Sequence, residues 1–289
     1  MNTVQQLNNA IHDFVRRPEN AVLRPGTGAY STPFRGSLFG CDLAQDVESK
    51  LADQKVSVLF LGSNPNCPAS LEQILDPVAG LGDWPEFEAQ LASGCFGESS
   101  VGQFGPRIGW DPLHNPSSMG PGQAGSWLFY AEAIRSAVGS LDGVAMANVF
   151  PWGSAELDDL IKALKGNALN RADPSLLDRV VGFANQQLEV IIKAFRPRLV
   201  LCPLSIFSHS ALAGLLLSRP RLKDLADRSP EGLAKAFTLQ LATASIAGLD
   251  QRLLFLKHPS ALRWHRASER PAIADALASA IGSIVRQAG

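Results

Sequence analysis

The chain has 289 residues, of which 46% are hydrophobic and 18% charged, and this composition predicts a globular protein with a sizeable core. With a formal net charge of −1, the chain as a whole has no electrostatic attraction to nucleic acid or membranes. This argues against a non-specific DNA-coating protein. The four cysteines form no CxxC pair, so we expect a reducing cytoplasm and neither a metal nor an iron–sulfur site.

The N-terminal part predicts a helix followed by irregular chain. Residues 1–20 have the pattern of an amphipathic helix and lack the apolar stretch of a secretory signal. Residues 21–42 are rich in Pro, Gly, Ser and Thr and predict an arm, and 42–54 predict a short helix. Residues 66–125 are dense in Gly and Pro, with room for helix within 76–92. A segment of this length inside a compact domain is usually functional.

Short apolar runs that end at proline or a polar residue predict buried parallel strands. Four such runs occur, at 56–65 (VSVLFLGSNP), 143–152 (GVAMANVFPW), 198–204 (RLVLCPL) and 252–260 (RLLFLKHPS).

Helical spacing of apolar residues fills most of the remaining chain. It predicts helices at 126–138, 155–164, 176–195, 209–217 and 271–286, and a helical insertion over 219–247. Strands that alternate with helices predict an α/β fold, a parallel sheet with helices on both faces. We find no linker and no membrane span, and expect one domain over 1–289 with an N-terminal arm (1–54) and an insertion (66–125).

Three predicted strands end in a polar side chain close to proline. Asn64 and His258 each stand directly before a proline, and Asn148 lies three residues before one. Open α/β folds bind ligands at the carboxyl ends of their strands, so we expect these side chains to share one site. Taken alone, Asn64 also fits an ordinary turn, Asn148 a cap or loop tie, and His258 a solvated surface histidine.

The motifs at these ends resemble those of the uracil-DNA glycosylase superfamily. GSNPN at 62–66 is similar to the family's first motif, and KHPSAL at 257–262 is similar to its second. MANVFPW at 146–152 is similar to the strand end that carries the base-reading asparagine in the mismatch-specific and single-strand-selective branches. The resemblance covers roughly residues 55–270 in the family's order. It implies a three-layer sandwich, with a small parallel sheet of about four strands flanked by helices.

The resemblance also implies an activity, the excision of uracil or a related deaminated base from DNA without a metal or cofactor. Cleavage leaves an oxocarbenium-like sugar and an anionic base, so the protein must place a water and stabilise the anion. By resemblance, the catalytic residues are Asn64, which orients the water, and His258, which donates a hydrogen bond to the base. An amide orients water without acting as a strong general base.

The remaining site residues implied by the resemblance bind substrate. Asn148 offers both a donor and an acceptor, which match one edge of an extruded base. Leu262 fills the gap that the base leaves in the duplex, or is an ordinary apolar residue at a helix start. Ser260 holds a phosphate, and the backbone of Gly62 and Ser63 assists.

Several alternatives stay open at this point. The aromatic residue that stacks on the base is Phe104, Trp110 or Phe129. The chain also fits a non-catalytic nucleic-acid-binding or interaction protein on the same fold, or an enzyme that acts on a free nucleoside or base. The lack of GxSxG disfavours a Ser–His hydrolase, and the lack of GxxxxGK[ST] or GxGxxG after a strand disfavours a nucleotide cofactor. The oligomeric state is not predicted.

Overall fold

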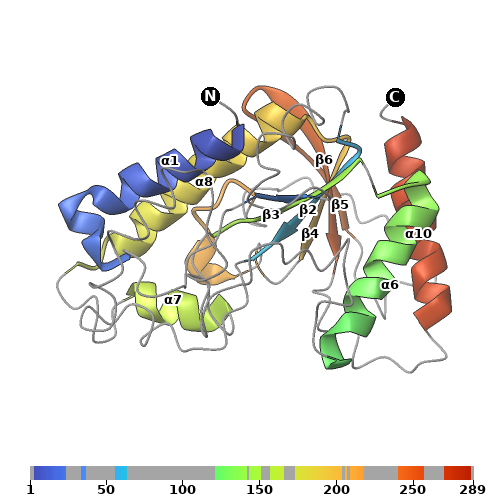
Figure 1. Cartoon of the computed structure of the whole chain (residues 1–289), viewed down its shortest axis with the longest axis horizontal. Coiled ribbons are helices and arrows are strands. Elements are labelled where there is room, and N and C mark those ends of the chain that lie inside the picture. Colours follow the sequence, from blue (N-terminus) through green and yellow to red (C-terminus); the bar gives the residue numbers. More distant parts are fainter. Residues whose placement is uncertain are drawn as a thin grey trace. The chain divides into compact units, whose positions relative to one another are not determined.

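The protein is described from a computed structural model, shown as a cartoon in Figure 1. The described residues are 3–23, 34–36, 56–63, 121–141, 143–150, 157–165, 173–203, 206, 209–217, 240–256 and 270–287.

The described residues contain a six-stranded sheet. Its strands are β1 (Phe34–Gly36), β2 (Val58–Gly62), β3 (Val144–Asn148), β4 (Leu199–Pro203), β5 (Gln240–Ile246) and β6 (Leu249–Leu256). They lie in the order β1-β3-β2-β4-β6-β5. β2 and β6 each pair in parallel with β4, whereas β5 runs antiparallel to β6.

The sheet confirms the predicted α/β class and contains all four predicted strands. It is mixed rather than parallel and has more than the expected four strands, because β1 and β5 were not predicted. The predicted helical insertion over 219–247 is wrong for 240–246, which form β5. The alanines of this stretch favour a helix, but its backbone bonds to β6 along the whole strand, and such pairing overrides local propensity.

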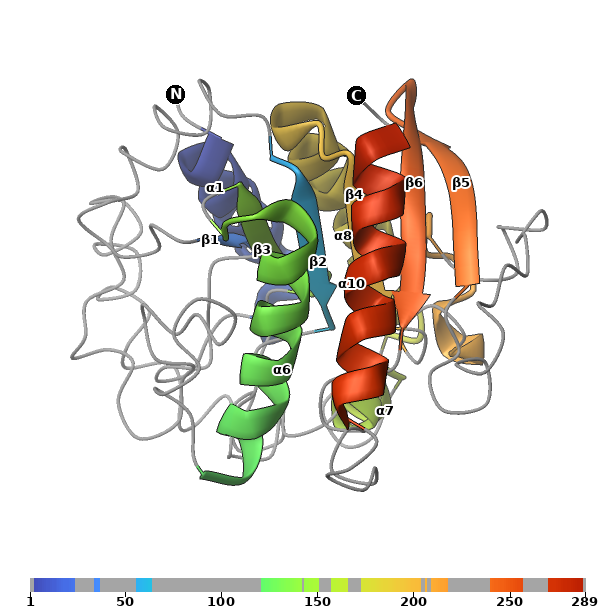
Figure 2. The same cartoon turned by 90° about the vertical axis from the view of Figure 1, so that its right-hand side faces the viewer.

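Two helices, α6 (Pro121–Val138) and α10 (Arg270–Gln287), lie side by side on one face of the sheet (Figure 2). α6 ends at Val138, and the following Gly139 takes a left-handed conformation (φ +86°) that closes the helix. The core that these helices share with alternate strand residues includes Val58, Phe60, Leu199, Leu201, Leu254, Leu256, Tyr130, Ile134, Leu277 and Ile281.

The intervening strand residues point to the opposite face of the sheet and are buried as well. They include Leu59, Leu61, Val200, Cys202, Leu253 and Phe255. Burial on both faces explains why these strands read as continuous apolar runs in the sequence.

Four further helical segments are α1 (Thr3–Arg16), the 3-10 helix η1 (Pro18–Leu23), α7 (Leu157–Lys165) and α8 (Leu176–Phe195). α1 lies alongside α8 (Figure 1), where the rings of Phe14 and Phe183 stack with centroids 4.3 Å apart. The predicted bounds of α8 are confirmed at both ends, because its apolar period is unbroken and Pro197 follows it.

The helix predicted over 209–217 is much shorter than expected. Only Ser210–Leu212 form a 3-10 helix, η5, and turns follow it. The Nδ1 atom of His209 accepts a hydrogen bond from the Ala211 N–H at 3.1 Å, so this histidine caps the short helix. This cap marks the start of the helix, close to the predicted start at 209, and the difference from the prediction lies at the other end.

Backbone packing divides the chain into two compact units. One comprises residues 1–49, 62–110 and 148–191, and contains α1, η1, α7 and most of α8. The other comprises 50–61, 111–147 and 192–289, and contains α6, α10 and most of the sheet. The single domain with an arm and an insertion stays a prediction. In the described part of the chain, no helix combines the length and apolar character needed to cross a membrane.

Candidate functional site

The carboxyl ends of β2 and β3 meet at one edge of the sheet. At the start of the strands, the Ser57 N–H donates to the Gly143 carbonyl at 2.7 Å. At their ends, the Val149 N–H donates to the carbonyl of Gly62, the last residue of β2, at 2.9 Å. The two strands therefore run in the same direction and finish together. This edge is where parallel sheets present their ligand-binding residues.

The backbone continues to join the two strand ends beyond the strands themselves. The Phe150 N–H donates to the Ser63 carbonyl at 2.9 Å, directly after the bond between Val149 and Gly62. Val149 and Phe150 are both buried, and their packing holds the chain in place where it leaves the sheet. Gly62, Ser63 and Asn148 are consequently held at fixed positions relative to one another.

Asn148 is the last residue of β3, and only 3% of it is exposed. Among the residues that the structure describes, none offers an acceptor within hydrogen-bonding distance of its Nδ2 atom. A buried donor without a partner costs about 1–3 kcal/mol of stability, so native structures rarely leave one unless it has a use. Among the described residues, the Asn148 Nδ2 therefore lacks an acceptor that a ligand at this edge would supply.

The structure brings together Gly62, Ser63 and Asn148 among the residues that the sequence predicts for the site. The other predicted site residues lie outside the described residues and are Asn64, His258, Ser260 and Leu262. The segment that carries Asn64 begins directly after Ser63, and the segment that carries His258 begins after the end of β6.

Phe129, one of the three aromatic residues considered for stacking on a base, belongs to the hydrophobic core. It is 8% exposed and meets the ring of Tyr130 edge-on, with centroids 5.5 Å apart. Its ring is used in packing α6 against the sheet, which argues against a stacking role. Phe104 and Trp110 lie outside the described residues.

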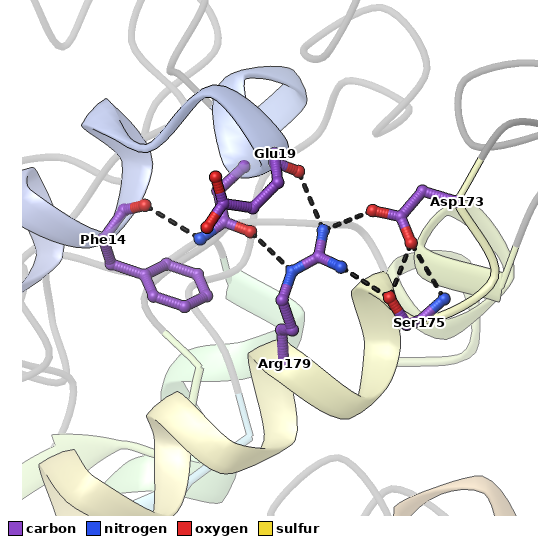
Figure 3. A network of polar contacts seen from close by, with 6 residues as sticks. Phe14, Glu19, Asp173, Ser175 and Arg179 are labelled. Carbon is purple, nitrogen blue, oxygen red and sulfur yellow. Dashed lines mark hydrogen bonds and ion pairs between the residues drawn. The ribbon is translucent and has the colours of Figure 1, made fainter.

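A polar cluster that the sequence did not predict joins η1 to the start of α8 (Figure 3). The Arg179 guanidinium donates from Nε to Asn20 Oδ1 at 2.9 Å and from Nη2 to the Glu19 carbonyl at 2.8 Å. It also donates to Ser175 Oγ at 2.6 Å and forms an ion pair with the Asp173 carboxylate. Asp173 in turn accepts from the backbone N–H and the hydroxyl of Ser175, the residue directly before α8.

The charges in this cluster stabilise each other. Hydrogen bonds from Arg179 and then Ser175 hold the pKa of the Asp173 carboxyl well below its usual range. The same bond to Asp173 raises the pKa of Arg179. Since the guanidinium is occupied by four partners, the cluster acts as a structural tie. The Asp-x-Ser pattern before α8 gives a sequence signal for the bonds between Asp173 and Ser175, but nothing near Asn20 marks it as a partner of Arg179.

Two further groups with shifted pKa values are buried and neutral. Burial raises the pKa of the Tyr130 hydroxyl and of the Cys202 thiol, so neither ionises at physiological pH. Within the described ranges, His, Cys, Asp and Glu residues form no group of three that could hold a metal ion. The sheet edge at Asn148 is therefore the best-supported candidate site in the described part of the chain.

No model of a protein family matches the chain, and no curated protein matches it.

Proposed function

We propose that this protein is a DNA base-excision glycosylase that hydrolyses the N-glycosidic bond of uracil or a related deaminated base. We propose also that its sheet belongs to a three-layer sandwich of the uracil-DNA glycosylase type. The support is the resemblance of the three motifs, in the family's order, together with the geometry at the ends of β2 and β3.

The observation that carries the proposal is the buried amide of Asn148. Its Nδ2 finds no acceptor among the described residues, and two backbone hydrogen bonds fix the end of β3 beside Gly62 and Ser63. The 2- and 4-oxo groups of uracil are acceptors of the kind that such an amide binds. The first motif, which contains Asn64, begins at the same point.

In the proposed reaction, the base departs with the electron pair of the glycosidic bond and water adds to C1′ of the sugar. Asn64 orients the water, and His258 donates a hydrogen bond to the base oxygen on which charge gathers. Loss of one such donor typically costs about 3 kcal/mol in the barrier, which is roughly a hundredfold in rate. Asn148 selects the base, Leu262 occupies its place in the duplex, and Ser260 holds a neighbouring phosphate.

The test uses labelled oligonucleotides that contain one uracil, hypoxanthine or xanthine, single-stranded and double-stranded, followed by alkali to cleave abasic sites. We expect strand scission with at least one of these substrates. We expect Asn64→Ala and His258→Ala each to slow excision by about a hundredfold or more. Lys193→Ala, on the exposed side of α8, serves as a matched control and should leave the rate unchanged. Absence of scission with the whole panel would contradict the proposal.

The neutral overall charge favours a second candidate, an enzyme that acts on a free nucleoside or base. A formal net charge of −1 gives little attraction to a DNA backbone. Release of base from a nucleoside by the wild-type protein, without action on any oligonucleotide, would support this candidate. Salt-dependent DNA binding without turnover would instead indicate a non-catalytic binding protein.

A further inference from the structure

Among the described strands, β5 forms one edge of the sheet. β5 is the last strand in the sheet order, and among the described strands only β6 pairs with it (Figure 2). The pairing runs without a bulge from Gln240 opposite Phe255 to Ile246 opposite Leu249. An edge strand presents a row of backbone groups to which another strand can bind.

The turn between β5 and β6 determines which backbone groups point outward. It has two residues, Ala247 (φ +53°) and Gly248 (φ +77°), both left-handed as in a type I′ turn. In such a hairpin, the pair that closes the turn, Ile246 and Leu249, exchanges both of its hydrogen bonds. Alternation then directs the N–H and C=O groups of three residues away from β6. These residues are Leu241, Thr243 and Ser245.

The side chains of β5 do nothing to prevent pairing. The strand reads QLATASI and contains no charged residue and no proline. Natural proteins usually protect an edge with lysine, proline or a bulge, and β5 has none of these. Thr243 and Ser245 are exposed, while Leu241 is half-buried against the core that includes residues of α6 and α10.

We propose that β5 pairs with β5 of a second copy of this chain, antiparallel and with Thr243 on the two-fold axis. In this register Thr243 lies opposite Thr243 of the partner, and Leu241 lies opposite Ser245. Each of these pairs exchanges two hydrogen bonds, so every outward backbone group of the three residues finds a partner. A two-fold contact uses the same residues from both copies. No like charges meet, and threonine opposite threonine is a favourable cross-strand pair.

A second copy can satisfy this edge without any other partner. The register places each outward residue of one β5 against an outward residue of the other, which requires no sequence other than QLATASI itself. The partly exposed Leu241 of each copy also becomes covered. The product is a continuous sheet across two protomers.

Sedimentation and light scattering of the full chain, from about 1 μM to about 500 μM, test the proposal. We expect a monomer–dimer equilibrium in the wild type. Thr243→Pro removes an outward N–H without removing any bond between β5 and β6, and should weaken dimerisation by at least about tenfold. Thr243→Val keeps the N–H and the branched side chain, and should still dimerise. A wild type that stays monomeric throughout, or a dimer that Thr243→Pro leaves intact, overturns the proposal.

Amide hydrogen exchange of the wild type gives a second measurement, which holds even if Thr243→Pro fails to fold. Protection of the amides of Leu241, Thr243 and Ser245 should increase with protein concentration. The amides of Ala242 and Ala244, which point toward β6, should be protected at every concentration. Fast exchange at all three outward positions in a concentrated sample excludes this contact.

Discussion

Two buried asparagines differ in how their side-chain amides are paired. Asn20 is fully buried, and both ends of its amide are used: Nδ2 donates to the Phe14 carbonyl at 2.9 Å, and Oδ1 accepts from Arg179. Asn148 is nearly as buried, yet no described residue accepts from its Nδ2. The first amide stabilises the fold, whereas the second is the one that we propose to bind a base.

This difference predicts opposite effects of the same substitution. Asn20→Leu leaves Arg179 and the Phe14 carbonyl without their partner, and should lower the free energy of unfolding by about 1–3 kcal/mol. Asn148→Leu removes an unpaired donor, and should leave stability within about 1 kcal/mol of the wild type, or raise it, while abolishing base excision. Urea unfolding and the oligonucleotide assay measure the two quantities. A large loss of stability in Asn148→Leu would mean that its amide is structural.

The ion pair between Asp173 and Arg179 predicts a pH-dependent contribution to stability. The folded-state pKa of Asp173 is depressed, so its contribution is complete above the unfolded-state pKa of about 3.9 and is lost as pH falls below that value. Asp173→Asn should therefore be less stable than the wild type at pH 7, and the two should converge as pH is lowered below about 4. Urea titrations at several pH values check this, and a difference that grows toward acid would contradict it.

At the scale of elements, the contact between α6 and α10 depends on a glycine. A Cβ atom at Gly282 would lie 3.3 Å from the Ala137 carbonyl oxygen of α6 and 3.2 Å from the Arg286 side chain. Gly182 also lies within a helix, but a Cβ there would have no heavy atom within 4 Å. Substitutions at these two positions therefore separate the effect of helix propensity on stability from the effect of crowding between α6 and α10.

Alanine at each site gives the prediction. Gly182→Ala should raise the free energy of unfolding by about 0.5–1 kcal/mol, because alanine favours the helix and restricts the unfolded chain. Gly282→Ala gains the same helix propensity but must push α6 aside. Its free energy of unfolding should therefore be at least about 1 kcal/mol lower than that of Gly182→Ala. Thermal and urea unfolding of the pair measure the difference. Equal stabilisation by both would show that the two helices are not in close contact at Gly282.

The turn between β5 and β6 gives another prediction for a single element. Alanine at φ +53° is strained, and asparagine before glycine is the preferred pair in a type I′ turn. Ala247→Asn should stabilise the protein by up to about 1 kcal/mol, whereas the branched Ala247→Val should destabilise it. Urea unfolding of both variants tests whether asparagine stabilises the protein and valine destabilises it. Destabilisation by asparagine would show that the turn is not of this type.

The elements also show what the sequence could and could not predict. The bounds of α8 follow from an unbroken apolar period and a proline, and four strands follow from apolar runs that stop abruptly. β5 was missed because its small residues also fit a helix, and only pairing with β6 selects the strand. The short η5 was missed because Leu215 and Leu217, which continue the apolar period, are buried in bends and turns rather than in a helix.

At the scale of the whole molecule, contacts between distant residues are the part that the sequence does not reveal. Asn20 and Arg179 are 159 positions apart, and no local pattern links them. The candidate site was partly predictable, because strand ends are readable and parallel strands present those ends at one edge. The burial of Asn148 and its unpaired Nδ2 required the packed structure, since they depend on everything that surrounds the end of β3.

The overall charge leads to the last prediction, which concerns how the proposed glycosylase would distinguish DNA molecules. With 26 basic and 27 acidic side chains, the chain offers little overall attraction to phosphates, so in the proposed function base contacts would supply most of the selectivity. Phosphate contacts depend on salt, whereas an amide that binds a base edge is uncharged. Rising salt should therefore weaken binding to uracil-containing and undamaged oligonucleotides in parallel, with their affinity ratio nearly constant. Fluorescence anisotropy with a slow variant such as His258→Ala measures both affinities. A ratio that collapses toward one as salt rises would show that charge, not Asn148, carries the discrimination.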